Sequence, residues 1–322
     1  MILETVLREY FSDNLFILSQ DIMRKASRIA LDYILKDTSR LVPNRVMGKT
    51  GLRGKAFGLG GQSLLEQENS QKQACDLIRK ALSLGVNYFD TATIYGPSRY
   101  YYGLCLKSGE GTIVASKVRE RSYSGAKKEL DETFRLLQRP YIDILQLHSI
   151  QEESDKKALR KDGALQVLRE AQQAGKIGYI GITGHADPQI LMDFMDEYPF
   201  DTLLIALNPT IPLYDEAVKK AKSLNMGVIA MKVMSRGILP KAFSPTDLIH
   251  YALDRADVAI VGCSDESDVE RNIISAAEYT PGKHPTFSIT PELIEESTYF
   301  VKGHSGRWPD TYQPDWPKIQ YD

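Results

Sequence analysis

Cysteine is scarce in this 322-residue sequence. The three residues, Cys75, Cys105 and Cys263, show no C-x-x-C spacing, so neither a disulfide framework nor a zinc site is expected, and a reducing compartment is the better interpretation. Long apolar runs are also missing, because none approaches the roughly 18 residues that a membrane-spanning helix needs. Residues 1–16 mix charged with apolar side chains and contain no signal-peptide core. The sequence therefore predicts a cytoplasmic protein.

Net charge is small as well. Lys and Arg number 40 and Asp and Glu number 42, which gives a formal net charge of −2 at pH 7. Nucleic acids and anionic membranes attract strongly basic surfaces, so neither is expected as a partner. The length allows one large domain or two ordinary ones, because α/β barrels exceed the usual size of a single domain. No metal is expected.

What the sequence does contain is a repeated pattern between residues 56 and 264. Eight short apolar runs recur there with helix-length stretches between them: AFGLGG, VNYFDTA, TIVASKV, YIDILQLH, IGYIGIT, DTLLIAL, GVIAMKVM and VAIVGCS. They are nearly continuous in Val, Ile and Leu, which is typical of parallel strands covered on both faces. Eight strand–helix repeats predict an α/β protein with a closed (β/α)8 TIM barrel. An open doubly wound sheet is the weaker interpretation, because AFGLGGQS lacks the third glycine of the G-x-G-x-x-G turn.

Amphipathic helices are predicted between these strands. Apolar residues at i, i+3, i+4 and i+7 mark helix candidates at 71–85, 126–138, 164–175 and 215–225. Three of these stretches end in a residue that suits a helix C-cap, namely Gly85, Gly175 and Asn225.

An N-terminal helical extension is predicted over residues 1–43, as two amphipathic helices that break near Asp13-Asn14. Its apolar stripe suits packing against the barrel or contact with a partner subunit. Association with a membrane surface is the less favoured alternative, because the polar face mixes acidic and basic residues. Residues 44–57 then indicate a β-hairpin around residues 49–51 that could cap the bottom of the barrel.

The barrel domain is predicted to span residues 44–302, and residues 303–322 form an irregular tail rich in proline and aromatic residues. Two interpretations of this tail stay open. It is either a surface strap held by Trp308 and Trp316, or a lid that contributes to a substrate pocket.

Four polar residues stand at or just after the ends of three consecutive predicted strands: Asp90, Tyr95, Lys117 and His148. Adjacent strand ends of a barrel bring their side chains into one pocket. A Lys ammonium beside a phenol favours the phenolate and lowers the phenol's pKa, and a carboxylate can hold that Lys in place. Such a phenol suits general acid–base catalysis, and a neutral histidine can orient a carbonyl oxygen.

Each of these residues also has a purely structural interpretation. Asp90 could cap the next helix or simply pair with Lys117, Tyr95 could belong to a turn, and His148 could be a satisfied barrel histidine. The joint placement on three successive strand ends favours function over four separate coincidences.

At this point the motifs GVNYFDTATIYG, IVASKV, DILQLHS, GKIGYIGIT and NRVMGKTGL resemble the aldo-keto reductases, from about Arg45 to about Asn272. The resemblance implies a (β/α)8 barrel and hydride transfer from a nicotinamide cofactor to an aldehyde or ketone. It also implies that Tyr95 is the proton donor, that Lys117 and Asp90 tune it, and that His148 orients the substrate carbonyl.

The resemblance implies a set of cofactor-binding residues, which are Gly60, Gly61, Asp90, Thr183, Gly184, Asn208, Met231, Lys232, Val233, Met234, Arg236, Gly262, Ser264, Asp268 and Asn272. Several depart from the family pattern at the carboxamide end. Thr183-Gly184 replaces a Ser-Asn pair, Asn208 replaces a Gln, and Met231 replaces an aromatic residue that stacks on the nicotinamide. His185 could substitute for the lost amide, although a solvent-exposed loop histidine is the favoured interpretation.

The adenosine end departs further. Gly262 and Asp268 occupy the positions where the family often has Lys and Arg on the 2′-phosphate of NADP. A carboxylate repels a phosphate dianion but can accept a hydrogen bond from a free ribose 2′-hydroxyl. NADP stays the family default and NAD is the alternative, since Arg271 and Ser264 could still serve a phosphate.

A carbonyl reductase acting on a small-molecule substrate is therefore the first functional hypothesis. The alternatives are a cofactor-binding regulatory subunit, resembling the aldo-keto reductase-like subunits of potassium channels, and a redox-neutral enzyme on the same barrel. The substrate's identity and the oligomeric state stay open.

Overall fold

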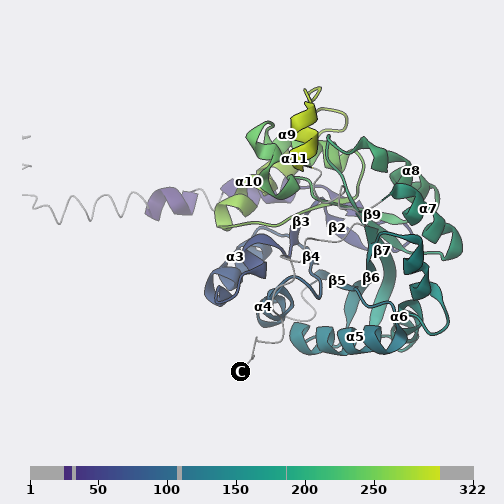
Figure 1. Ribbon diagram of the computed structural model, residues 1–322. Coiled ribbons are helices and arrows are strands. Elements are labelled where there is room, and N and C mark those ends of the chain that lie inside the picture. The colour runs from purple at the N-terminus through teal and green to yellow at the C-terminus, as the bar shows by residue number, and fades with distance from the viewer. Residues whose placement is uncertain (1–24, 31–33, 107–110, 186, 298–322) are drawn as a thin grey trace, which may run out of the picture.

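The computed structural model describes residues 25–30, 34–106, 111–185 and 187–297 (Figure 1). The first predicted helix of the extension and the tail from residue 303 lie outside the described residues, so these predictions and the domain boundaries stay predictions. Within the extension, residues 25–30 and 34–41 are helical. The described part packs against the barrel domain, because Leu35 is buried in the main core and Arg28 pairs with Glu270 at 2.7 Å.

Eight parallel strands close into a barrel in the order β10-β3-β4-β5-β6-β7-β8-β9, which confirms the predicted fold class. Each predicted apolar run contains one strand. The strands are β3 (Phe57–Gly60), β4 (Tyr88–Asp90), β5 (Ile113–Val118), β6 (Ile142–Ile150), β7 (Ile177–Gly184), β8 (Thr202–Ala206), β9 (Gly227–Met231) and β10 (Val258–Val261).

Helices surround the strands on the outside (Figure 1). They are α3 (Gln71–Ser83), α4 (Ser98–Cys105), α5 (Tyr123–Leu137), α6 (Ala164–Gln173), α7 (Pro188–Glu197), α8 (Asp215–Ser223), α9 (Pro245–Leu253), α10 (Glu266–Ala277) and α11 (Pro291–Ser297). The predicted caps are confirmed, because Gly85, Gly175 and Asn225 adopt φ values of 74°, 68° and 54°. These left-handed values let the chain turn away from the helix end.

The strands bury both faces. One apolar cluster fills the barrel interior and contains Met47, Tyr88, Ile113, Ala115, Ile144, Leu204, Ile229, Met231, Val258 and Ile260. A larger cluster fills the space between the outer face of the strands and the helices. Because neighbouring residues of a strand point to opposite faces, the residues of β10 alternate between the two clusters, with Val258 and Ile260 inside and Ala259 and Val261 outside. The interior is therefore a packed core and not a channel.

An antiparallel hairpin of β1 (Asn44–Val46) and β2 (Arg53–Lys55) closes the bottom of the barrel, as predicted. The side chain of Met47 is fully buried in the interior cluster, and Gly48 forms a bridge with Met226. Gly48 has a φ of 50°, and an added Cβ would lie 2.4 Å from the Asn225 carbonyl oxygen, so only glycine fits there. Burying a side chain such as Met47 stabilises the fold by roughly 1.5–3 kcal/mol.

The cysteines do not stay unpaired, contrary to the expectation from their spacing. Cys75 on α3 and Cys105 on α4 form a disulfide, and their Cα atoms lie 5.8 Å apart. The bond joins two helices that are neighbours in space, although the two cysteines are 30 residues apart in sequence, and their spacing alone does not reveal this contact. Cys263 is free and buried. The inference of a reducing compartment rested on the cysteines being unpaired, and the disulfide removes that basis.

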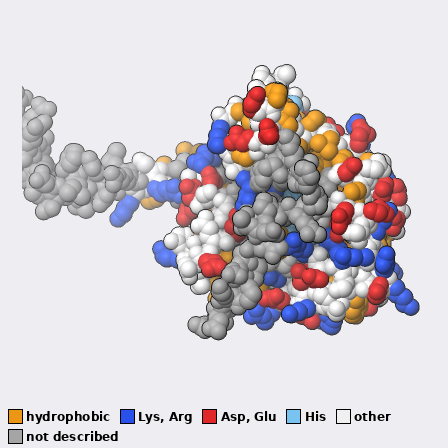
Figure 2. Space-filling view, viewed as in Figure 1, with side chains coloured by type: hydrophobic (Ala, Val, Ile, Leu, Met, Phe, Trp, Pro, Cys, Tyr) orange, Lys and Arg blue, Asp and Glu red, His pale blue; other side chains and the backbone are white. Residues whose placement is uncertain are grey.

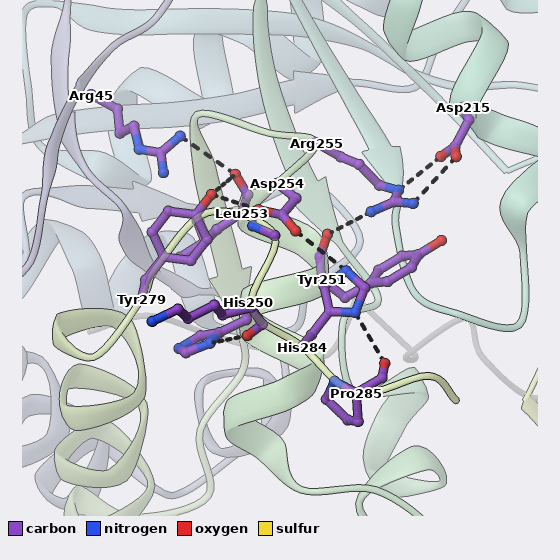
Figure 3. A network of polar contacts seen from close by, with 12 residues as sticks. Arg45, Asp215, His250, Tyr251, Leu253, Asp254, Arg255, Tyr279, His284 and Pro285 are labelled. Atoms are coloured by element: carbon purple, nitrogen blue, oxygen red, sulfur yellow. Dashed lines mark hydrogen bonds and ion pairs between the residues drawn. The ribbon is translucent and has the colours of Figure 1, made fainter. Parts of the chain in front are cut away.

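The segment after α10 is fastened to the C-terminal end of α9 by a network of polar contacts (Figure 3). Asp254 accepts hydrogen bonds from the Tyr279 hydroxyl at 2.7 Å and from the Gly282 N–H at 2.9 Å, and its other oxygen lies 3.3 Å from His284 Nε2. Next to it, the Arg255 guanidinium stacks on the Tyr251 ring at 3.7 Å. This network holds the segment between α10 and α11 against α9.

The end of α11 is buried among loops at the C-terminal edge of the barrel. The Ser297 hydroxyl donates to Thr210 Oγ1 at 2.8 Å, and the Ser297 carbonyl accepts a hydrogen bond from Ser235. Thr210 follows β8 and Ser235 follows β9, so α11 helps to hold both loops.

Acidic and basic side chains are interspersed over the visible face of the molecule (Figure 2). Among the helices of the described ranges, none combines the length and apolar character of a transmembrane helix. The cytoplasmic location predicted from the sequence stays a prediction.

Candidate active site

Asp90, Tyr95, Lys117 and His148 gather at the C-terminal edge of the barrel. Asp90 ends β4, Lys117 is the second-last residue of β5, and Tyr95 lies in the loop between β4 and α4. His148 lies two residues before the end of β6, slightly deeper than the strand end that the sequence suggests. All four are buried. The structure therefore brings together the residues that sequence analysis singled out.

The Lys117 ammonium is the centre of this group. It donates to Asp90 Oδ1 at 2.5 Å and to the Thr91 carbonyl at 2.8 Å. It also lies 4.9 Å from the centre of the Tyr95 ring, and that ring meets the His148 ring edge to face at 6.0 Å. A cation and a neutral imidazole thus flank the phenol.

The loop that carries Tyr95 is tied to α4 and to its neighbours. Thr91 Oγ1 donates to Ser98 Oγ at 2.9 Å, and the Arg99 guanidinium donates to the Thr93 carbonyl at 3.3 Å. Gly96 has a φ of 49°, and an added Cβ would lie 2.2 Å from the Glu66 carbonyl oxygen. The phenol is therefore placed by a rigid loop, as positioning of a catalytic group requires.

Burial decides the protonation states. It raises the pKa of Tyr95 well above 10, and the nearby carboxylates of Asp90 and Glu66 raise it further. Burial thus outweighs the lowering of this pKa that the sequence predicts from Lys117. Burial, Lys117 and His185 lower the pKa of His148 well below 6.5. At neutral pH the phenol keeps its proton and His148 is neutral.

The ion pair itself is strongly desolvated. Burial raises the pKa of the Asp90 carboxyl and lowers the pKa of the Lys117 ammonium, and the charge of each partner opposes the shift of the other.

A cavity of about 530 Å³ opens beside Tyr95. Most of the residues that the resemblance implied for the cofactor line it together with Tyr95, and these are Gly60, Gly61, Asp90, Met231, Lys232, Val233, Met234, Arg236, Gly262, Ser264, Asp268 and Asn272. They come from the loops after β3, β9 and β10 and from the first turns of α10.

Three of the implied residues do not line this cavity. Thr183 and Gly184 end β7, where the Thr183 side chain is fully buried. The Asn208 amide donates to the Lys232 carbonyl at 2.9 Å, and its oxygen accepts hydrogen bonds from the N–H and hydroxyl of Thr210. Asn208 therefore holds the loop after β9 and does not face the cavity.

His185 is buried, and the interpretation as a solvent-exposed loop histidine is wrong. Its side chain lies just beyond β7 and is 2% exposed. Burial, followed by the charges of Lys232 and Lys117, lowers its pKa to about 3. A second neutral histidine therefore stands near His148 at the barrel mouth.

The short helix η1 (Ser63–Glu66) follows β3 and was not predicted from the sequence. Its residues Ser63 and Glu66 line the cavity. Ser63 Oγ lies 2.9 Å from Ser264 Oγ, and Glu66 pairs with Arg236 at 3.2 Å. Its contribution to the site could have been predicted, because η1 follows a strand whose C-terminal end lies at the same edge of the barrel as Asp90, Tyr95, Lys117 and His148 (the tetrad). Six further residues line the cavity but were not predicted to belong to the site: Gln62, Gly237, Pro240, Pro245, Ile260 and Val261.

The loop after β9 supplies cationic groups. Lys232, Ser235 and Arg236 all adopt left-handed φ values, of 56°, 41° and 55°, and such a conformation in non-glycine residues is retained at functional sites. Burial and the Arg236 charge lower the pKa of Lys232 to about 7. An anionic ligand would raise that pKa and meet two cations at this loop.

The cavity has the chemistry of a dinucleotide site. Its wall contains Tyr95 and Asp90, the apolar Met231 side chain, the cations Lys232 and Arg236, and Asn272 from α10. Gly61 lets the chain after β3 pack closely against the neighbouring loop, since an added Cβ would lie 2.4 Å from Ser98 Oγ and 2.6 Å from the Asp90 carbonyl oxygen. A nicotinamide dinucleotide needs an apolar ring site, a cationic pyrophosphate site and a polar adenosine site, and these residues fit those needs.

Comparison with known proteins gives consistent matches. The model of the aldo/keto reductase family matches residues 56–258. L-galactose dehydrogenase of Arabidopsis thaliana is 27% identical over 285 residues, which cover 73% of this chain and 88% of that protein. Pyridoxal 4-dehydrogenase of Microbacterium luteolum is 26% identical, covering 66% of this chain and 77% of that protein.

Solved structures show the same fold. A holo-form aldo-keto reductase from Bacillus halodurans superposes with a TM-score of 0.62 at 20% identity, covering 85% of this chain and 100% of that chain. Since the family model extends from the first barrel strand to the start of the last, this protein is a member of the aldo/keto reductase family and an oxidoreductase.

Proposed function

We propose that this protein reduces an aldehyde or ketone to an alcohol with NAD(P)H, and that Tyr95 is the general acid. The observation that carries the proposal is that Tyr95 lines the cavity while the Lys117 ammonium, paired with Asp90, lies 4.9 Å from its ring and the His148 ring lies 6.0 Å from it.

When bound, the reduced nicotinamide supplies the hydride that the carbonyl carbon accepts. Tyr95 donates its proton to the carbonyl oxygen, so an alcohol forms and a phenolate is left. The Lys117 ammonium, 4.9 Å from the ring, stabilises that phenolate until the phenol regains a proton from solvent. Neutral His148 donates a hydrogen bond to the same oxygen and orients the carbonyl.

The remaining cavity residues would hold the cofactor. Met231 offers an apolar surface to the nicotinamide ring, Lys232 and Arg236 face the pyrophosphate, and Asn272 serves the adenine. Burial of the site excludes water from the reacting carbon and strengthens these interactions.

The test is Tyr95→Phe, which removes only the phenolic hydroxyl. We expect kcat/KM to fall by roughly 10²–10⁴-fold, which is the usual contribution of a general acid. Binding of NADH or NADPH, measured by fluorescence titration, should persist. The names of the two relatives suggest a panel that includes L-galactose, pyridoxal and simple aldehydes. Tyr141→Phe is the matched control, because Tyr141 is 39% exposed before β6.

Undiminished turnover of the Tyr95→Phe enzyme would contradict the proposal. Cofactor binding without turnover on any carbonyl substrate would instead favour the regulatory alternative.

A further inference from the structure

The strand that carries His148 is irregular at that residue. The register of β6 with β7 shifts between Leu147 and Ile150, so His148 and Ser149 lie in a break of the regular ladder. Ser149 has a φ of 54°, a left-handed value that costs energy in a residue other than glycine. Such irregularities redirect side chains and are common next to active sites. The backbone at His148 therefore needs a group that holds this conformation.

The Arg121 guanidinium provides that group. Its Nη2 donates to the His148 carbonyl at 2.7 Å and to the Ser149 carbonyl at 2.9 Å, and its Nη1 donates to the Arg119 carbonyl at 2.5 Å. Arg119 directly follows β5, the strand that carries Lys117. One buried side chain thus ties the end of the strand with Lys117 to the end of the strand with His148.

Asp155 fixes the guanidinium in turn. Its Oδ1 accepts a hydrogen bond from Arg121 Nε at 2.8 Å, and its Oδ2 accepts from the N–H groups of Gln151 and Glu152 at 2.8 and 3.2 Å. The side chains of Arg121 and Asp155 are 9% and 14% exposed, so salt and water screen this charge-assisted pair only weakly. The pair therefore joins the loop after β5 to the loop after β6.

The His148 imidazole depends on its backbone for its direction. Among the described residues, no hydrogen bond reaches its buried Nδ1. Its ring meets the Tyr95 ring edge to face at 6.0 Å, a contact that allows the imidazole to turn. The direction of the ring is therefore set by packing and by the backbone that Arg121 holds.

We propose that Arg121 is a positioning residue for His148, which it serves by holding the irregular backbone at the end of β6; the inference rests on the proposed function. In that function, His148 donates a hydrogen bond to the carbonyl oxygen that receives the proton of Tyr95. A displacement of such a group by about 1 Å can lower the rate roughly 10²-fold. Neither Arg121 nor Asp155 is among the described residues that line the cavity, so their effect on turnover must pass through another residue.

The test is Arg121→Lys, which keeps the positive charge but loses the planar fork that donates to Asp155 and to the carbonyls together. We expect kcat/KM to fall by about 10–100-fold. The dissociation constants of NADH and NADPH, measured by fluorescence titration, should stay within about twofold of the wild type. Arg139→Lys is the matched control, because Arg139 is equally buried and lies before β6, at the opposite end of that strand. Its kcat/KM should stay near that of the wild type.

A double-mutant cycle with His148→Gln separates positioning from a general structural role. If Arg121 acts through His148, Arg121→Lys should change kcat/KM by less than about twofold once His148 is already replaced. Asp155→Asn is the second variant if Arg121→Lys does not fold, because it keeps the shape of the side chain and removes the charge that holds Arg121. We expect the same coupling to His148 for it.

The inference and the proposed function fail separately. An Arg121→Lys enzyme as active as the wild type, or a loss equally large in the His148→Gln background, overturns the role of Arg121 and leaves the proposed function intact. Undiminished turnover by Tyr95→Phe, or no turnover of any carbonyl compound by the wild-type protein, overturns the proposed function, and the role of Arg121 with it.

Discussion

Lys117 is an ammonium group buried within the barrel. It is fully buried, and its nearest charge is the Asp90 carboxylate at 2.5 Å. A buried pair of this kind adds little net stability over apolar residues, but removing one partner leaves an uncompensated charge. The pair is therefore explained better by its chemistry than by stability.

The first prediction concerns this pair. We expect Lys117→Met to lower the free energy of unfolding by about 3–5 kcal/mol, because Asp90 would be left buried and unpaired. The double variant Asp90→Asn/Lys117→Met should recover most of that loss and stay inactive. Urea denaturation at pH 7 measures both. A single variant as stable as the wild type would show that the pair is not desolvated as the structure has it.

At the scale of elements, the sequence predicts what short-range chemistry determines. The eight apolar runs, the hairpin and the caps at Gly85, Gly175 and Asn225 follow from local composition and backbone preference, and all are found. The left-handed residue that ends α5 is Gln138, which no composition rule selects. Here tertiary packing overrides the propensity of a single residue.

The features of the candidate site can likewise be divided into those that the sequence predicts and those that it does not. The tetrad was predictable because strand ends of a barrel converge on one edge. The reach of η1 over the cavity and the burial of His185 depend on loop conformations, which periodicity does not encode. The amide of Asn208 donates to the Lys232 carbonyl in the loop after β9, a long-range contact that the local sequence pattern does not encode.

The disulfide between α3 and α4 gives a prediction at this scale. Under denaturing, non-reducing conditions a thiol assay should count one free cysteine, Cys263, and three after reduction. Cys105→Ser should lower the free energy of unfolding by about 3–4 kcal/mol, since the bond closes a loop of 30 residues. Cys263→Ala is the comparison that leaves the bond intact. Three free thiols before reduction would refute the pairing.

At the scale of the whole molecule, two buried neutral histidines at the barrel mouth make the fold sensitive to acid. The pKa of His185 is lowered to about 3 and that of His148 lies well below 6.5. In the unfolded chain both take up protons as the pH falls through about 6.5, whereas in the folded chain they do not. Their contribution to stability is complete above that pH and is lost as the pH falls.

We therefore expect the free energy of unfolding to decrease between pH 6.5 and pH 5 by up to about 1.4 kcal/mol per pH unit for each histidine. Chemical denaturation at half-unit intervals measures the slope. His185→Gln should show a shallower slope, because one of the two groups no longer titrates. An identical slope in the variant would mean that His185 is solvated in the folded protein.

The packing of Met47 against the bottom of the barrel has a consequence for how the sequence of this protein can diverge in evolution. With one end of the barrel covered by the hairpin, Met47 packs into the interior on the side where the strands begin, and Tyr95 lies on a loop at the side where they end. Loops at this second side can therefore be lengthened, shortened or exchanged without altering the contacts of the hairpin.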